Sequence, residues 1–201
     1  MGFSYFFRDV YSLNIAADKL LETFAGNKEI KIWDAGCSFG AEPFTFSIIL
    51  AERMGHFAFK KVKILATDID SKFGKVLSDR IYEYKNLERI PKDYFAKYFD
   101  PTSKENYFQV STTISDRISF QTHDLLSLKP IDTEFSLIIC KNVLLHLNYQ
   151  QRIKVIEMYH KALMKNGLLV MEHTQPLPVE LEKYFTKLSS SSQFFQKKVL
   201  S

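Results

Sequence analysis

Residues 33–44, WDAGCSFGAEPF, connect an apolar run to a helix-forming segment, and this connection decides the fold. Glycines stand at Gly36 and Gly40, and a helix is expected to open at Glu42 and Pro43, because proline is favoured in a first helical turn. Glycine lets the backbone approach a ligand closely, and a helix N-terminus offers free N–H groups and a positive dipole end. We therefore predict that this turn is a ligand cradle between a strand and a helix.

Two common phosphate-binding patterns do not fit this turn. The dinucleotide fingerprint G-x-G-x-x-G requires a glycine where Ser38 stands, and a P-loop requires G-K-[ST] after four intervening residues. The next apolar run ends in ATDID, which places Asp68 or Asp70 where an acid can accept hydrogen bonds from both ribose hydroxyls. The residues thus favour a nucleoside without a pyrophosphate.

Apolar runs alternate with helix-period segments along the chain, which is typical of an α/β fold with a mostly parallel sheet. The predicted strands are 30–36, 62–68, 135–142 and 167–173. The predicted helices, 43–55 and 149–167, each end at a glycine, a common helix stop. We expect one domain over residues 1–201, with a small antiparallel β-subdomain at about 100–120.

The composition excludes several other classes of protein. With 46% hydrophobic and 25% charged residues, the 201-residue chain is typical of globular proteins, and no apolar run reaches the ~20 residues of a membrane helix. The N-terminus lacks the pattern of a secretory signal, so we expect a cytoplasmic protein without membrane insertion. Cys37 and Cys140 have no metal or disulfide spacing, and a scattered net charge of +4 does not indicate nucleic-acid binding.

The motifs, taken in order, resemble one family. FFRD at 6–9, AGCSFGAEPF at 35–44, ATDID at 66–70, HDLL at 123–126 and CKNVLLHL at 140–147 are similar to motifs of the catalytic domain of the chemotaxis receptor methyltransferases, CheR. The resemblance implies a class I S-adenosylmethionine (SAM)-dependent methyltransferase fold, Rossmann-like, with S-adenosylhomocysteine as the product. It also implies methyl transfer to a glutamate carboxylate of a protein, the cytoplasmic region of a chemoreceptor.

The resemblance further implies which residues form the site. The cofactor-binding residues would be Ser4, Arg8, Gly36, Cys37, Ser38, Glu42, Asp68, Ile69, Asp124, Leu125, Asn142 and Val143. Glu42 would face the amino group of the methionine moiety, Asp68 would hold the ribose, and Asp124 would lie at the adenine end. Asn142 would lie near the sulfonium, and His146, where the family has Tyr, is the candidate catalytic residue in contact with substrate.

Each assignment has a structural alternative. Arg8 could be the polar edge of an amphipathic first helix, and Glu42 could only complement a helix dipole. Asp70 could replace Asp68 as the ribose acid, Asp124 could be a turn residue, and Asn142 could cap a helix.

The chain departs from the family pattern at several positions. Ala41, Lys141 and His146 replace Glu, Arg and Tyr, and EHTQ at 172–175 replaces GHSE. The helical domain that precedes the family's Phe-Phe-Arg segment has no counterpart in these 201 residues. We expect the departures to lie on the acceptor side of the site. Two alternatives therefore stay open: a methyltransferase for another protein or a small molecule, and a degenerate SAM-binding regulatory or interaction domain.

Overall fold

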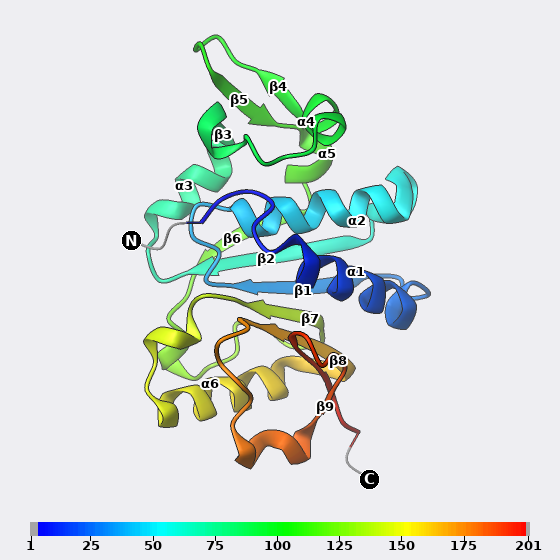
Figure 1. Ribbon diagram of the computed structural model, residues 1–201, viewed down its shortest axis with the longest axis vertical. Coiled ribbons are helices and arrows are strands. Elements are labelled where there is room, and N and C mark those ends of the chain that lie inside the picture. The colour runs from blue at the N-terminus through cyan, green and yellow to red at the C-terminus, as the bar shows by residue number, and fades with distance from the viewer. Residues whose placement is uncertain (1–3, 200–201) are drawn as a thin grey trace.

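The computed structural model describes residues 4–199, which form a main sheet and a smaller one. Within these residues the main sheet has seven strands in the order β6-β2-β1-β7-β8-β10-β9 (Figure 1). Its strands are β1 (Ile30–Ala35), β2 (Val62–Asp68), β6 (Ile118–Thr122), β7 (Phe135–Cys140), β8 (Leu163–Met171), β9 (Phe185–Lys187) and β10 (Gln193–Lys197). The first five strands of that order pair in parallel. β10 pairs antiparallel with both β8 and β9. The predicted mostly parallel sheet is confirmed.

Helices lie on both faces of this sheet. The α-helices are α1 (Val10–Phe24), α2 (Ala41–Phe59), α3 (Lys72–Asp79), α4 (Lys92–Tyr98), α5 (Thr112–Ser115) and α6 (Tyr149–Ala162). Short 3-10 helices are η1 (Tyr84–Asn86), η2 (Leu125–Ser127), η3 (Leu144–His146) and η4 (Val179–Tyr184). The buried side chains of α1 and α2 pack against one face, and those of α6 pack against the other. No helix among the described residues is both long and apolar enough to cross a lipid bilayer.

Successive strand residues belong to two separate cores. Ile32 and Leu137 pack in the cluster with α1 and α2, whereas their neighbours Trp33 and Ile138 pack in the cluster with α6. The Trp33 ring meets the ring of Tyr159 in α6 edge to face, with centroids 5.2 Å apart. Because neighbouring side chains of a strand point to opposite faces, a strand covered on both faces is apolar throughout. This explains the continuous apolar runs in the sequence.

The small sheet has different bounds from those expected. It consists of β3 (Ile81–Glu83), β5 (Tyr107–Val110) and β4 (Phe99–Pro101), paired antiparallel in that order. The predicted range of 100–120 is therefore wrong at both ends. It omits β3, and it includes residues of β6, which pairs in parallel with β2 and belongs to the main sheet.

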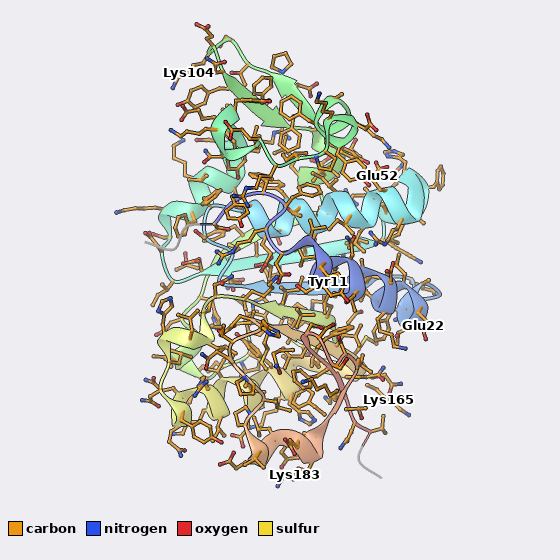
Figure 2. All side chains as sticks on the ribbon, in the orientation of Figure 1. Tyr11, Glu22, Glu52, Lys104, Lys165 and Lys183 are labelled. Carbon is orange, nitrogen blue, oxygen red and sulfur yellow. The ribbon has the colours of Figure 1, made fainter. Side chains whose placement is uncertain are left out.

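One carboxylate of α2 accepts two hydrogen bonds from the unit that contains the small sheet. Glu52, labelled in Figure 2, accepts hydrogen bonds from Lys97 Nζ at 2.7 Å and from Tyr98 Oη at 2.5 Å. Both donors belong to α4, which leads directly into β4. Together with the packing of Tyr82 in β3 on Phe44 in α2, this contact joins the small sheet to α2.

The two glycines expected to stop helices behave differently. Gly55 has φ +71° and interrupts the helical geometry inside α2, although helix resumes as far as Phe59. The predicted stop at Gly167 is wrong, since α6 ends at Ala162 and Gly167 lies within β8. Leu163 is already extended and pairs with Phe135 of β7, so sheet pairing ends the helix early.

Candidate functional site

The strand order places a crevice at the ends of β1 and β7. From β1 the chain builds the sheet outward through β2 and β6, and then returns to place β7 on the other side of β1. The loops after these two neighbouring strands therefore leave in opposite directions, which is where open α/β sheets bind ligands.

Two adjoining cavities occupy this crevice, with volumes of about 330 and 340 Å³. Gly36, Asp68, Asn142, Val143 and His146 line both of them. The first also contains the predicted residues Ser4, Arg8, Cys37, Ser38 and Glu42, and the second contains Ile69, Asp124 and Leu125. The structure thus brings all thirteen predicted site residues together. Volumes of this size are typical of small-molecule and cofactor sites.

The turn after β1 is pressed against the loop after β7. Gly36 has φ +95°, and a Cβ added there would lie 2.2 Å from Cγ2 of Val143. The backbone N–H groups of Gly36 and Cys37 both donate to the carbonyl of Thr67, at 2.8 and 2.9 Å. Only glycine fits this position without displacing Val143, so the turn packs closely on the loop after β7, and its role as a ligand cradle stays a prediction.

Asp68 is held at the end of β2 by backbone groups. Its Oδ2 accepts from Ser38 N–H at 2.9 Å, and its Oδ1 accepts from Asp70 N–H at 3.1 Å. An ionised carboxylate has about four acceptor positions, so it can accept from two further hydroxyls. The neighbouring Ile69 side chain is 70% exposed, which leaves an apolar surface beside the cavity. Asp70 instead accepts from Lys72 N–H at 3.0 Å, at the start of α3.

Glu42 lies in the first turn of α2 with its side chain 18% exposed. Its Oε2 is 3.8 Å from Nζ of Lys141. Burial raises the pKa of Glu42, and the Lys141 ammonium opposes this rise. A carboxylate with so little solvent, at the wall of an open cavity, suits a cationic ligand group better than water.

Aromatic packing anchors the segment before α1 over the cavity. Phe6 is fully buried, and its ring lies 5.0 Å from Tyr82 and 6.3 Å from Phe44, measured between centroids. The next residue, Phe7, donates its N–H to Oγ1 of Thr45 at 3.0 Å. These contacts hold the flanking polar residues of the segment at the cavity wall.

Arg8 crosses the cavity to the loop after β7. It donates through a terminal guanidinium nitrogen to Oδ1 of Asn142 at 3.1 Å. Arg8 precedes α1, so it is not the polar edge of that helix. Asn142 caps neither helix that follows it, because the N-cap of η3 is Val143 and that of α6 is Asn148. Both structural alternatives are therefore excluded by the geometry.

Asp124 both makes a turn and lines a cavity. Asp124 accepts from Leu126 N–H at 2.8 Å and so makes the turn that begins η2, as the structural alternative expected. It also lines the second cavity, together with Leu125 and the 42% exposed side chain of Leu126. The turn presents an apolar surface opposite Ile69.

Two departures from the family pattern do not lie where the sequence suggested. Ala41 is fully buried in the core beneath α2. Lys141 has a side chain only 3% exposed and lies beside Glu42, on the wall that carries the predicted cofactor residues. The expectation that the departures lie on the acceptor side is therefore wrong for both. His146, exposed on η3, lines both cavities.

Sequence reasoning missed two buried acids near the site. Asp34 in β1 is 1% exposed, and neither of its carboxylate oxygens has a hydrogen-bond partner among the described residues. Glu172, after β8, is 5% exposed, and neither of its carboxylate oxygens has a hydrogen-bond partner among the described residues. Burial raises its pKa, and nearby backbone N–H groups oppose this rise. An acid within an apolar strand is the signal that could have found Asp34.

The two cysteines are free and buried. Burial raises the pKa of both thiols, with the Asp34 carboxylate adding to the rise at Cys37. Cys37 is thus a small packed residue of the cradle and not a reactive thiolate. Among residues 4–199, no three His, Cys, Asp or Glu side chains gather as metal ligands.

Comparison with known sequences points to one family. The model of the CheR methyltransferase SAM-binding domain matches residues 2–194. A chemotaxis protein methyltransferase of Borreliella burgdorferi is 31% identical over 182 residues, covering 87% of this chain and 64% of the relative. One from Vibrio parahaemolyticus is 26% identical over 181 residues, covering 89% and 66%. The chain thus spans about two thirds of the length of these relatives.

Solved structures support the fold. The magnesium protoporphyrin IX methyltransferase of Synechocystis, determined with bound SAM, matches with a TM-score of 0.51 at 16% identity, over 93% of this chain and 76% of that one. PKMT2 from Rickettsia typhi, in complex with AdoHcy, also gives 0.51 at 15% identity, over 86% and 27%. At these identities the likeness concerns the fold alone, that of class I methyltransferases.

Proposed function

The chain belongs to the CheR methyltransferase family, as its SAM-binding domain, and from this premise we propose that it methylates a glutamate side-chain carboxylate of a protein. The cytoplasmic region of a chemoreceptor is the proposed acceptor, and residues 1–201 are proposed to act as one domain. One observation carries the proposal: a poorly solvated acid, Glu42, and a backbone-held acid, Asp68, line the same cavity.

The side chains around the crevice match the parts of SAM. Asp68 would accept from the ribose hydroxyls, and Glu42 would pair with the α-ammonium. Arg8 would face the α-carboxylate, while Ile69 and Leu126 would cover the adenine. Gly36 and Val143, which a Cβ on Gly36 would force apart, would form the floor beneath the ligand. The residues present therefore fit the cofactor.

Methyl transfer to a carboxylate does not require a catalytic base. Bound SAM supplies a methyl group on a positively charged sulfur. A glutamate carboxylate is already ionised at neutral pH, so no residue has to remove a proton. The cavity residues therefore need only to align the two reactants and exclude water. Asn142 and His146, which line both cavities, are the proposed contacts at the reacting end.

Two measurements test the proposal. Calorimetry with S-adenosylhomocysteine should show binding that Asp68→Ala abolishes, whereas Asp100→Ala, an exposed change on β4, should bind like the wild type. Incubation with tritiated SAM and a chemoreceptor cytoplasmic fragment should then give base-labile glutamyl methyl esters.

Each negative result points to a different alternative. If S-adenosylhomocysteine binds but the tritiated methyl group appears on another protein or on a small molecule, the proposed acceptor is wrong and the cofactor site stands. Binding without transfer to any acceptor would favour a regulatory domain, and absence of binding would refute the site.

A further inference from the structure

Lys141 is a buried lysine with three polar neighbours. Its Nζ donates to Oδ2 of Asp9 at 2.5 Å and to Oγ of Ser12 at 3.1 Å, and it lies 3.8 Å from Oε2 of Glu42. Lysine is seldom buried without paired charges, because its ammonium loses hydration. One ammonium therefore connects the end of β7 with the starts of α1 and α2.

We propose that Lys141 is a positioning residue that keeps the Glu42 carboxylate ionised and turned toward the cavity, ready for the cationic end of the cofactor. This inference rests on the proposed function, since it concerns the same site. It adds a residue of the cavity wall, with a side chain only 3% exposed, that acts through Glu42.

The charges around Glu42 explain why a buried cation is needed. Asp9 and Arg8 face it from the segment before α1, Lys141 from just after β7, Glu172 from just after β8 and Asp34 from β1. Burial raises the pKa of Glu42 most strongly, Lys141 is the largest opposing influence, and Asp9 raises it further. Without Lys141, the carboxylate would stand mainly among other acids and would take up a proton more readily. A protonated Glu42 has no charge for an ammonium ligand.

A purely structural role for Lys141 makes a different prediction. The contact between Lys141 and Asp9 joins α1 to β7, and either partner's removal would break it. If joining the elements were its only role, both changes would weaken cofactor binding alike. The charges, in contrast, act in opposite directions, because Lys141 lowers and Asp9 raises the pKa of Glu42.

The experiment measures the affinity for S-adenosylhomocysteine by calorimetry between pH 5.5 and 8.5. Ratios of variant to wild-type affinity cancel the titration of the ligand. Wild-type binding should weaken as the pH falls and Glu42 becomes protonated. Lys141→Met should move this loss to higher pH, with an affinity deficit that grows to about tenfold as the pH falls and disappears toward pH 8.5. Asp9→Asn should move the loss to lower pH.

Two further variants identify the group responsible. Lys141→Arg keeps the charge and should retain the wild-type profile. Glu42→Gln should bind weakly at every pH and lose this titration. Thermal unfolding of each ligand-free variant checks that it is folded, and Asp9→Asn still decides the matter if Lys141→Met does not fold.

The outcomes separate the inference from the proposed function. Opposite pH shifts for Lys141→Met and Asp9→Asn support the role of Lys141. Losses in the same direction, or losses independent of pH, overturn it while leaving the cofactor site intact. A wild-type protein that does not bind at any pH overturns the proposed function and this inference together.

Discussion

Asp34 provides a test of the electrostatics beneath the site, through the change Asp34→Asn. Its carboxyl group is 1% exposed, and neither oxygen has a hydrogen-bond partner within residues 4–199. Burial raises its pKa well above the ordinary value, and the charge of Glu42 adds to this, with Lys141 opposing. We therefore expect Asp34 to be a neutral carboxylic acid in the folded protein over a range where it is ionised in the unfolded chain.

The sign of the pH dependence follows from proton counting. An unfolded aspartate loses its proton near pH ~3.9. Between that value and the higher folded pKa, the folded state holds one more proton than the unfolded state. Its free energy of unfolding therefore falls by about 1.4 kcal/mol for each pH unit of rise. Below this window the ionisation of Asp34 takes nothing from the free energy of unfolding, and above it the loss is constant.

Urea unfolding at pH 5, 6, 7 and 8 measures the effect. Asparagine has a similar shape and does not titrate, so Asp34→Asn should gain about 1.4 kcal/mol per pH unit over the wild type within the window. Glu42 and Glu172, whose pKa values burial also raises, contribute to both proteins.

The control is Asp132→Asn, at an exposed ion pair with Lys31. Lys31 lowers the pKa of Asp132, so this acid is ionised in both states above pH 5 and its difference from wild type should be flat. An equally flat difference for Asp34→Asn would show that Asp34 carries no extra proton and would refute the reasoning.

Three other changes test the cradle, the ribose acid and the N-terminal anchor. Gly36→Ala should lower the free energy of unfolding in urea by about 1–3 kcal/mol, since φ is +95° and the new Cβ would meet Val143 at 2.2 Å; adding Val143→Ala should restore part of it, and no recovery would argue against the clash. Asp68→Asn should weaken S-adenosylhomocysteine binding about 10- to 100-fold in calorimetry, because a hydrogen bond to a charged group contributes about 1.5–3 kcal/mol; Asp124→Asn, measured alongside, should lose less. Phe6→Ala should cost about 3–5 kcal/mol in urea unfolding, because its ring is fully buried; a near-wild-type value would mean that this segment does not pack as described.

The main sheet could be predicted from the sequence because a strand buried on both faces is apolar along its whole length. All four predicted strands are present, and the turn after β1 lies where the glycines indicated. The site residues also came together, since most of them follow the carboxyl ends of parallel strands, which lie at one edge of the sheet. The N-terminal segment with Arg8 was placed by resemblance alone, because its anchor, Phe6 against Tyr82, is a contact between distant parts of the chain.

The errors have a different physical origin. β3 has only three residues, Ile81–Glu83, too few for an alternating pattern to show. Ile118–Thr122 alternates like an edge strand of an antiparallel sheet, yet it pairs in parallel with β2 at the edge of the main sheet. Pattern alone cannot tell these two edges apart, because both leave one side of the strand exposed.

Lys141 shows what a residue-by-residue comparison with a family leaves out. By its motif, Lys141 is a departure beside Asn142 and was expected on the acceptor side, but its ammonium is buried between Asp9 and Glu42. The replacement of Arg by Lys keeps the positive charge at that position. Ala41 lines neither cavity, because the core beneath α2 encloses it. Of the single-residue departures, only His146 lines the cavities from an exposed position, so a change in acceptor preference is expected to depend on His146.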